Sequence, residues 1–420
     1  MPTKTPCRYG MYYSPVAGPY RQADLEAYLP VLQAMGARWL VLRSTATRAV
    51  PEGFLQGLLQ ADITPIIHFA LPLATPLAEV QPLLRAYARW GVKHILLFDR
   101  PNQRAAWGAG WHQPDLPGRF LDAFIPLAAA AAQEGLTPFF PPLEPGGDYW
   151  DLAFLRASLE GLRRRNPDLA AQIGITAYAW SEGKPLDWGK GGPEVWPEAQ
   201  PYHTPPSSQD HRGFYIFDWY ALEARAALGR VPPIFLAGMG SRYGREAAER
   251  VETKNVAIAR ACRGNHLAES VIGGAFYVLT APAEHSDASA AWLDANGKPS
   301  GMVQALTESN RPKEAHAAET AKKSPDNPPL SQQPYVLLPR FADGLPSHYL
   351  NAALPWLQSG TATVGFQIEE ALQAAEIIII GQPEDYAEEI RTALLEARRP
   401  LQWIPLNGTD VAQNVAQTEA

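Results

Sequence analysis

The chain has 420 residues, of which 46% are apolar and 19% are charged, and its formal net charge is −7. This composition is typical of a globular protein, and the modest negative charge argues against nucleic-acid binding. No run of about 18 apolar residues occurs, so we expect no membrane span, and a chain of this length is expected to form two domains.

The N-terminal residues, MPTKTPCRYGMYYSP, lack the apolar stretch and small-residue cleavage site of a secretory signal peptide. We therefore expect a cytoplasmic protein by default, with export by a signal-free route left open. The two cysteines, Cys7 and Cys262, imply no disulfide framework. No Cys, His, Asp or Glu cluster has the spacing of a metal site, so we expect no metal and no other cofactor.

From Arg8 to about Leu306, short apolar runs alternate with amphipathic stretches of helical periodicity. The apolar runs predict strands at residues 9–14, 38–44, 65–71, 93–99, 137–143, 173–180, 233–238 and 271–279. Eight such β/α units predict a (β/α)₈ barrel over residues 1–307. A doubly wound open sheet is the alternative, but it normally carries a Gly-rich turn after its first strand, and YYSPVAGPY is a poor version of one.

Residues 308–334 are polar, Pro-rich and lysine-bearing, which predicts a linker. Residues 335–408 then follow the order βαβαβαβ, which predicts a small, mainly parallel α/β domain, and residues 409–420 are expected to fray. Gly365 precedes a helix whose N-terminus suits an anion, but Glu369 and Glu370 already complement that helix dipole. We therefore prefer protein docking to nucleotide binding as the role of this domain.

The functional residues of a (β/α)₈ barrel lie at the C-terminal ends of its strands. The predicted strand ends carry, in chain order, Arg43, His68, Asp99, Arg100, Asn102, Glu144, Asp148, Tyr178, Trp180 and Gly238. Asp99 and Glu144 are the candidate catalytic carboxylates, and the other residues are candidate substrate contacts. The segment 181–213 is the longest between predicted elements, and loops of that length are usually functional.

The strand-four run ILLFDRPN and the strand-seven run PIFLAGMG resemble motifs of the retaining glycoside hydrolases in the large (β/α)₈ clan that includes cellulases and xylosidases. In that family strand four is followed by Asn-Glu-Pro, and strand seven by Thr-Glu-x-Gly. ITAYAW is similar to the family's strand six, and Arg43 stands where many members carry an arginine on strand two. The resemblance covers about 300 residues and implies a barrel whose mouth binds carbohydrate.

The departures from the family pattern fall on its two catalytic glutamates. Asp99 replaces the asparagine, Arg100 replaces the acid/base glutamate, and Gly238 takes the place of the nucleophile. Retaining hydrolysis needs two carboxylates about 5 Å apart, one to protonate the leaving oxygen and one to attack. Arginine exchanges no proton near neutral pH, and glycine has no side chain. The sequence therefore predicts a pseudoenzyme that binds an oligosaccharide or polysaccharide without hydrolysing it.

Two alternatives remain. In an active glycoside hydrolase with relocated carboxylates, Asp99 would be the base or nucleophile, kept ionised by Arg100, and Glu144 would be the acid. Against it, Asp99 suits a structural salt bridge and Glu144 suits the capping of a turn. In an anion-binding barrel, the Gly-rich run AGMGSRYGR after strand seven would present backbone N–H groups, with Arg242 and Arg245 adding charge.

Aromatic side chains suit the apolar faces and polar edges of sugars. Those predicted at or near the barrel rim are Tyr12, Trp107, Trp111, Trp180, Trp188, Trp196 and Tyr202. We expect Trp180 and the rings of segment 181–213 to stack on pyranose rings, and Arg100 makes an acidic sugar a candidate ligand. The competing interpretation is that these rings only fold the segment onto the barrel. For His68, a structural hydrogen bond within its apolar strand competes with a ligand contact.

Overall fold

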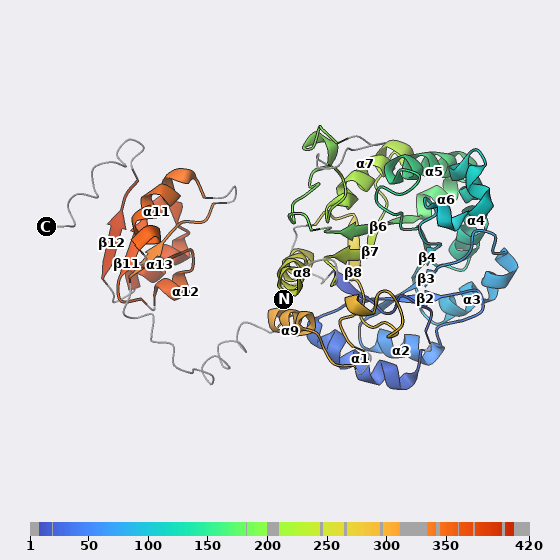
Figure 1. Ribbon diagram of the computed structural model, residues 1–420, viewed down its shortest axis with the longest axis horizontal. Coiled ribbons are helices and arrows are strands. Elements are labelled where there is room, and N and C mark those ends of the chain that lie inside the picture. Colours follow the sequence, from blue (N-terminus) through green and yellow to red (C-terminus); the bar gives the residue numbers. More distant parts are fainter. Residues whose placement is uncertain are drawn as a thin grey trace. The chain divides into compact units, whose positions relative to one another are not determined.

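The computed structural model describes residues 8–18, 20–181, 183–199, 210–243, 247–263, 267–294, 297–310, 334–341, 345–359, 361–372, 374–396 and 400–406. The chain divides into two compact units, residues 1–312 and 313–420, and each is treated separately below (Figure 1). Within the described ranges, no helix is long and apolar enough to cross a membrane.

The larger unit is a closed barrel of eight parallel strands, each hydrogen-bonded to the next, with β8 paired to β1. The strands are β1 (Tyr9–Tyr12), β2 (Trp39–Ser44), β3 (Thr64–Phe69), β4 (His94–Leu97), β5 (Thr137–Phe140), β6 (Gly174–Trp180), β7 (Ile234–Gly240) and β8 (Val271–Phe276). Closure of the sheet confirms the predicted (β/α)₈ barrel and excludes the open-sheet alternative.

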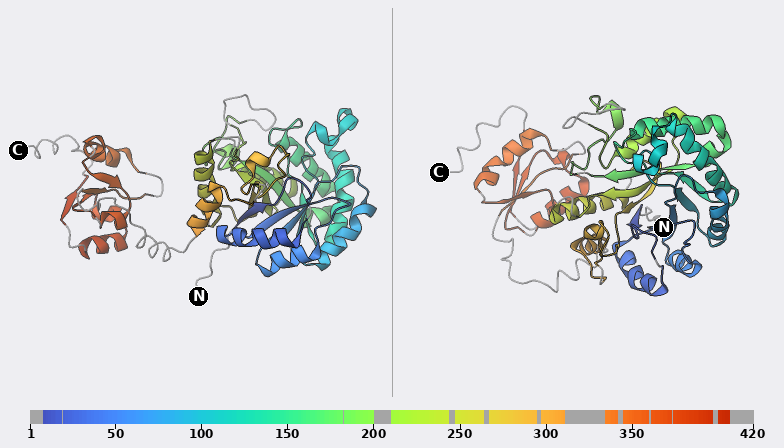
Figure 2. Two further views of the ribbon diagram at one scale, coloured as in Figure 1. Left: turned by 60° about the horizontal axis from the view of Figure 1, so that its bottom comes forward. Right: turned by 45° about the vertical axis from the view of Figure 1, so that its right-hand side comes forward.

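Helices surround the barrel, as Figure 2 shows from two further directions. They are α1 (Gln22–Met35), α2 (Glu52–Gln60), α3 (Leu77–Arg89), α4 (Leu116–Gln133), α5 (Asp151–Arg165), α6 (Pro167–Gln172), α7 (Ile216–Leu228), α8 (Ala248–Arg263) and α9 (Gly301–Asn310). Short 3-10 helices lie in the connections that follow strands, namely η1 (Arg104–Ala106), η2 (Gly108–His112), η3 (Gly192–Glu194) and η4 (Ala288–Ala290).

Side chains of each strand alternate between the inside of the barrel and the helical layer. On β2, Val41 packs inside the barrel, whereas Leu40 and Leu42 belong to the layer between sheet and helices. Because both faces of the sheet are covered, the strands are apolar almost throughout, which is why they appear in the sequence as short continuous apolar runs.

The N-terminal end of the barrel is plugged by the indole of Trp39. Its ring meets His94 at 5.8 Å and Phe235 at 5.5 Å between centroids. Gly273 admits this ring, since a Cβ there would lie 2.6 Å from Trp39 Nε1. The side chains that remain open to solvent are therefore at the opposite end, where the strands finish.

Helix α9 continues to Asn310, three residues into the range 308–334 that the sequence assigns to a linker. Asn310 Nδ2 donates to the carbonyl oxygen of Ala34 at 3.0 Å, and Arg263 Nη1 donates to that of Ser309 at 2.7 Å. These contacts attach the end of α9 to α1 and α8, so residues 308–310 belong to the barrel unit. The expected linker residues 311–333 and the tail 409–420 lie outside the described residues.

The smaller unit is a parallel four-stranded sheet in the order β10-β9-β11-β12. Its elements are β9 (Tyr335–Leu337), α11 (Ser347–Ser359), β10 (Thr363–Gly365), α12 (Ile368–Ala371), β11 (Ile377–Ile380), η6 (Pro383–Asp385), α13 (Glu388–Glu396) and β12 (Leu401–Ile404). Helix α11 packs on one face of the sheet, and α12 and α13 cover the other. This arrangement confirms the predicted small parallel α/β domain.

Sheets of this strand order bind ligands where two neighbouring strands send the chain in opposite directions, here at the ends of β9 and β11. Tyr386 fills that position. Its hydroxyl lies 2.9 Å from the carbonyl oxygen of Leu337 and 2.7 Å from that of Ile380, and the residue is 4% exposed. The crevice that a nucleotide would use is therefore occupied by a side chain of the protein itself.

Candidate functional site

A tight turn at the end of β4 directs Asp99 into the mouth of the barrel. The residues on either side of it, Phe98 and Arg100, have φ angles of 69° and 48°, which residues other than glycine rarely adopt. The Phe98 amide donates to Phe69 O at 2.7 Å, and the Arg100 amide donates to Pro142 O at 2.9 Å. Backbone strain of this kind is concentrated at functional sites, where the surrounding structure holds it in place.

The Asp99 carboxylate is held by side chains from two other strands. Arg43 Nη2 donates to Asp99 Oδ2 at 2.8 Å, and the Tyr178 hydroxyl donates to Oδ1 at 2.8 Å. Burial by itself would raise the pKa of Asp99, but the charges of Arg100 and Arg43 and the Tyr178 hydrogen bond lower it below its usual value. Asp99 is therefore ionised at neutral pH, as the sequence predicts, and its structural salt bridge to Arg43 is present.

A buried hydrogen-bond chain leads from Arg43 to the turn that follows β4. Arg43 Nε donates to the Tyr12 hydroxyl at 2.9 Å, and that hydroxyl lies 2.7 Å from His68 Nδ1. His68 Nε2 is 2.8 Å from Phe98 O, which fixes the proton on Nε2 and leaves Nδ1 to accept from Tyr12. Burial lowers the pKa of His68 to about 4, so its ring is neutral. His68 is fully buried and both ring nitrogens are engaged within the protein, which is the structural hydrogen bonding weighed in the sequence analysis.

The guanidinium of Arg100 stands between the two candidate catalytic carboxylates. Its Nε is 3.2 Å from Glu144 Oε2 and 3.7 Å from Asp99 Oδ1, and its Cζ lies over the Tyr178 ring at 4.8 Å from the centroid. The contact with Glu144 is an ion pair without hydrogen-bond alignment. These side chains are partly open to solvent, with 42% of Arg100, 36% of Glu144 and 19% of Asp99 exposed.

The space beside Gly238, the residue expected at the place of the family nucleophile, is filled by an indole ring. A Cβ on Gly238 would lie 2.2 Å from Cη2 of Trp180, so only glycine fits there. The Trp180 ring stacks on Tyr178 at 5.3 Å and 16°, and Arg242 lies over it at 4.3 Å. Trp180 is 4% exposed. The neighbours of Trp180 in the mouth therefore already cover the ring that the sequence analysis expected to stack on a sugar.

Two further candidate contacts brace loops instead of facing the mouth. Asn102 is fully buried, and its amide donates to Glu144 O at 2.9 Å and Tyr149 O at 3.0 Å while accepting from Glu144 N at 2.9 Å. Asp148 accepts from the Arg104 amide at 2.8 Å, at the start of η1. Asn102 thus fixes the backbone of Glu144, and Asp148 fixes the start of η1.

The rings in the described part of segment 181–213 pack on one another and on the backbone of the same segment. Trp188 and Trp196 face each other at 4.9 Å, and Trp188 Nε1 donates to Asp210 O at 2.9 Å. Asp210 also holds Lys184 at 2.5 Å and Arg212 at 2.8 Å. Tyr202 lies outside the described residues.

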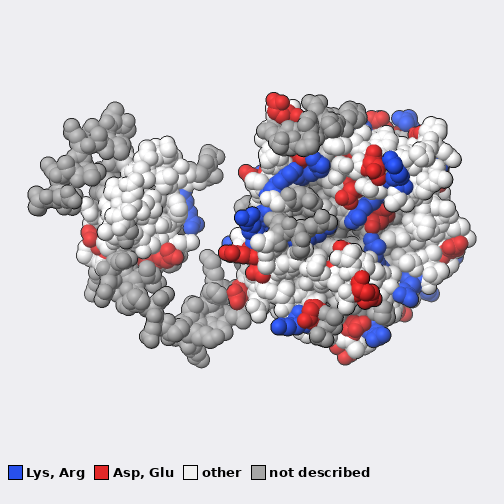
Figure 3. All heavy atoms as spheres, in the orientation of Figure 1, with Lys and Arg blue, Asp and Glu red and all other residues white. Residues whose placement is uncertain are grey.

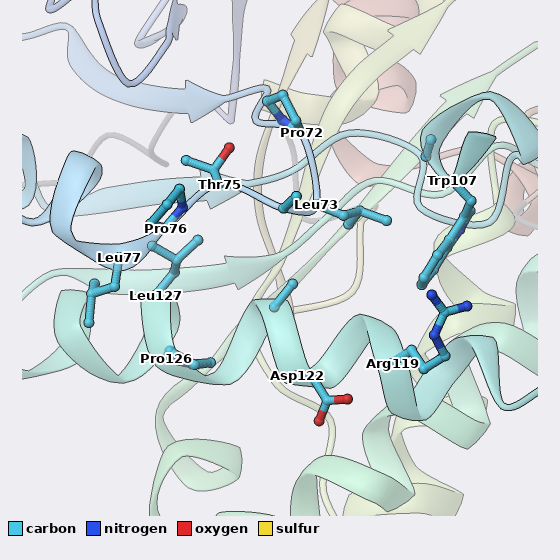
Figure 4. A pocket seen from close by; sticks show the side chains of 13 residues that line it. Pro72, Leu73, Thr75, Pro76, Leu77, Trp107, Arg119, Asp122, Pro126 and Leu127 are labelled. Carbon is cyan, nitrogen blue, oxygen red and sulfur yellow. The ribbon is translucent and has the colours of Figure 1, made fainter. Parts of the chain in front are cut away.

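The other two tryptophans lie beyond the turn that carries Asp99. Trp107 Nε1 donates to Pro101 O at 2.6 Å, and Arg119 lies over its ring at 5.0 Å. Trp107 and Arg119 form one side of a largely apolar hollow of about 680 Å³ outside the mouth, shown in Figure 4. Trp111 lies under Arg104 at 5.9 Å. These rings pack on loops and stand apart from the carboxylates.

In the described part of the Gly-rich run after β7, the Ser241 amide is already used within the protein. The Ser241 amide donates to Asn255 Oδ1 at 2.8 Å, and Asn255 Nδ2 donates back to Ser241 O at 2.9 Å. Arg242 lies over Trp180, and Arg245 is outside the described residues. In the same described ranges, no group of three or more His, Cys, Asp or Glu side chains is arranged to hold a metal ion.

A buried cluster behind Glu144 was missed by the sequence analysis. Asp151, at the start of α5, has both carboxylate oxygens 3.0 Å from His211 Nε2 and accepts from Tyr220 at 2.9 Å and from the Gly146 amide at 2.8 Å. Asp151 and His211 are both fully buried. The cluster ties the turn after Glu144 to the end of segment 181–213. No local motif marks it, because Asp151 lies 60 residues from His211 and 69 from Tyr220.

No protein-family model matches the sequence, and no curated protein matches it. Among solved structures, the chain is similar to a family 39 glycoside hydrolase from Bacteroides cellulosilyticus, with a TM-score of 0.51 and 13% identity, over 73% of this chain and 64% of that one. The barrel is glycoside-hydrolase-like in fold. The chain thus spans less than two thirds of the Bacteroides protein, and at this identity the likeness concerns the fold alone.

Two further structures are similar at lower scores. One is a GH128 (subgroup II) endo-β-1,3-glucanase from Sorangium cellulosum, with a TM-score of 0.44 and 16% identity over 73% of this chain and 99% of that one. The other is Gas2p from Saccharomyces cerevisiae in complex with laminaritetraose and laminaripentaose, with a TM-score of 0.44 and 9% identity over 71% of this chain and 62% of that one.

Proposed function

We propose that the mouth of this glycoside-hydrolase-like barrel binds a carbohydrate without hydrolysing it. The observation that carries the proposal is the position of Arg100, whose guanidinium contacts both Asp99 and Glu144. Hydrolysis requires one carboxyl group that gives a proton and one carboxylate free to attack or to activate water. An arginine in contact with both groups occupies the place where the glycosidic oxygen would have to lie.

The side chains that remain open at the mouth suit the hydroxyl groups of a sugar. Arg43, Asp99, Arg100 and Glu144 are all partly exposed and supply donors and acceptors in alternation. Each sugar hydroxyl both donates and accepts, so such an array can satisfy several of them at once. Figure 3 shows basic and acidic side chains interspersed over one face of the barrel unit.

The alternative of an active hydrolase has one observation in its favour, the approach of Asp99 and Glu144 to the same guanidinium nitrogen. The low pKa of Asp99 restricts it to the role of base or nucleophile, which leaves Glu144 as the acid. We rank this alternative second, because a general acid has to hold a proton that the neighbouring arginine disfavours.

The test is binding and turnover on the same panel of neutral and uronic-acid oligosaccharides, measured by calorimetry and by product analysis. We expect wild type to bind at least one member, Arg100→Ala to weaken that binding about tenfold or more, and no product to form. Arg163→Ala, an exposed arginine on α5, is the matched control and should bind as wild type does. Turnover that disappears in Glu144→Gln would establish the hydrolase instead.

A further inference from the structure

A polar cluster of Tyr277, His285 and Asp287 lies in the loop that follows β8, apart from the arginines and carboxylates described above. The Tyr277 hydroxyl donates to Asp287 Oδ2 at 2.6 Å, and the Asp287 amide donates to His285 Nδ1 at 3.1 Å. His285 Nδ1 also lies 3.7 Å from Asp287 Oδ2, and the two side chains are 30% and 34% exposed. The three residues, here called the β8-loop cluster, therefore form one connected group that solvent reaches.

Tyr277 places the β8-loop cluster at the mouth of the barrel. Its ring meets Tyr12 at 5.4 Å and Trp180 at 5.8 Å between centroids, and both of those rings pack inside the barrel. Burial and the hydrogen bond to Asp287 raise the pKa of Tyr277, and the positive charge of Arg43 opposes this rise. The cluster thus lies on the β8 side of the mouth, within reach of the charge of the β2 arginine.

The loop that carries the cluster is fixed near both of its ends. The Leu279 amide donates to the carbonyl oxygen of Tyr12 at 2.8 Å, and the Trp292 amide donates to that of Val278 at 2.9 Å. Side chains that are positioned before a ligand arrives lose less conformational entropy on binding than side chains that the ligand has to order. The β8-loop cluster is therefore a preformed set of polar groups.

The direction of the hydrogen bonds within the cluster determines what it offers to a ligand. A backbone N–H can only donate, so His285 Nδ1 accepts from the Asp287 amide and the neutral ring carries its proton on Nε2. The Tyr277 hydroxyl uses Asp287 Oδ2. Among the residues that the structure describes, no group is hydrogen-bonded to His285 Nε2 or to Asp287 Oδ1. The cluster therefore offers one donor and one charged acceptor side by side.

We propose that His285 and Asp287 bind the same carbohydrate as Arg100, from the β8 side of the mouth, through two neighbouring hydroxyl groups of one sugar ring. The inference rests on the proposed function, because it concerns the same ligand in the same mouth. One hydroxyl accepts from His285 Nε2, and its neighbour donates to Asp287 Oδ1. Hydrogen bonds to a charged acceptor are the stronger kind, so Asp287 makes the stronger of the two contacts.

The test is calorimetry of the full chain with cellopentaose and tetragalacturonic acid, a neutral and an acidic chain whose rings keep neighbouring 2- and 3-hydroxyls. Asp287→Asn keeps the size of the side chain and an acceptor for Tyr277 but removes the charge, and should weaken binding about tenfold. His285→Ala should weaken it about threefold or more. Glu284→Gln removes the same charge from an exposed position of the same loop and should bind as wild type does.

The outcomes separate this inference from the proposed function. If Arg100→Ala weakens binding while Asp287→Asn and His285→Ala bind as wild type does, the β8-loop cluster is not part of the site, and the proposed function stands. If wild type binds neither probe, this inference is wrong, and the remaining oligosaccharides of the panel decide the proposed function. A melting curve for each variant checks that a loss of binding is not a loss of fold.

Nuclear magnetic resonance of the full chain with ¹⁵N-labelled histidine gives a second readout, and the signal lost in His285→Ala identifies that ring. We expect the ring to be protonated on Nε2 in the free protein and its Nε2 signal to shift when a probe binds. A ring protonated on Nδ1 overturns the hydrogen-bond directions on which the inference depends. An unshifted signal in the presence of a bound probe overturns the contact itself.

Discussion

Replacing Gly238 by alanine tests whether the Trp180 ring fills the space beside Gly238. A Cβ there would lie 2.2 Å from Cη2 and 2.7 Å from Cζ2 of Trp180, whereas real Cβ contacts below 3.0 Å essentially never occur. The ring cannot retreat freely, because Tyr178 stacks on it and Tyr277 meets it edge-on at 5.8 Å. We expect Gly238→Ala to lower the free energy of unfolding by about 1–3 kcal/mol, the usual cost of overpacking a core.

Urea denaturation followed by far-ultraviolet circular dichroism measures this cost. The control is Gly53→Ala in α2, where a Cβ would meet no atom within 4 Å and alanine favours the helix. Trp180→Leu removes the obstructing ring, so Gly238→Ala added to that variant should cost almost nothing. A loss below about 0.5 kcal/mol for Gly238→Ala in the wild-type background, the range of ordinary surface substitutions, would refute this account of the mouth.

Two further predictions concern buried polar groups. The pKa of His68 is lowered to about 4 in the folded protein, below its unfolded value, so its contribution to stability is complete above about pH 6.5 and is lost as pH falls toward 4. The free energy of unfolding should fall by about 3 kcal/mol over that interval because of His68. Urea melts of His68→Gln should show a weaker dependence of the unfolding free energy on pH than wild type. An unchanged dependence would contradict the assignment of a neutral, buried His68 ring. Asp151→Ala strips the partners from His211, Tyr220 and the Gly146 amide, and should cost about 3–5 kcal/mol. The exposed Asp148→Ala should cost under about 1 kcal/mol in the same urea melts, and equal losses would contradict a special role for Asp151.

Local patterns in the sequence are sufficient to predict the fold of both units. The alternation of short apolar runs with amphipathic stretches depends only on neighbouring residues, and it predicts the strands of the barrel and of the smaller sheet. The parallel arrangement then places the ends of all barrel strands on one rim. This is why Arg43, Asp99 and Tyr178, which lie on three different strands, could be assigned to one site and are found in contact.

What occupies the mouth was decided only by tertiary packing. The glycine at 238 predicts that a nucleophile is missing, but only the structure shows that Trp180 from the neighbouring strand fills the space beside it. The identity of a tryptophan does not reveal which of its faces is buried, so Trp180 was expected to face a ligand. The contact of Arg100 with Glu144 and the partnership of Asp151 with His211 likewise join residues far apart in the chain. Contacts of that kind leave no periodic or local signal in a single sequence.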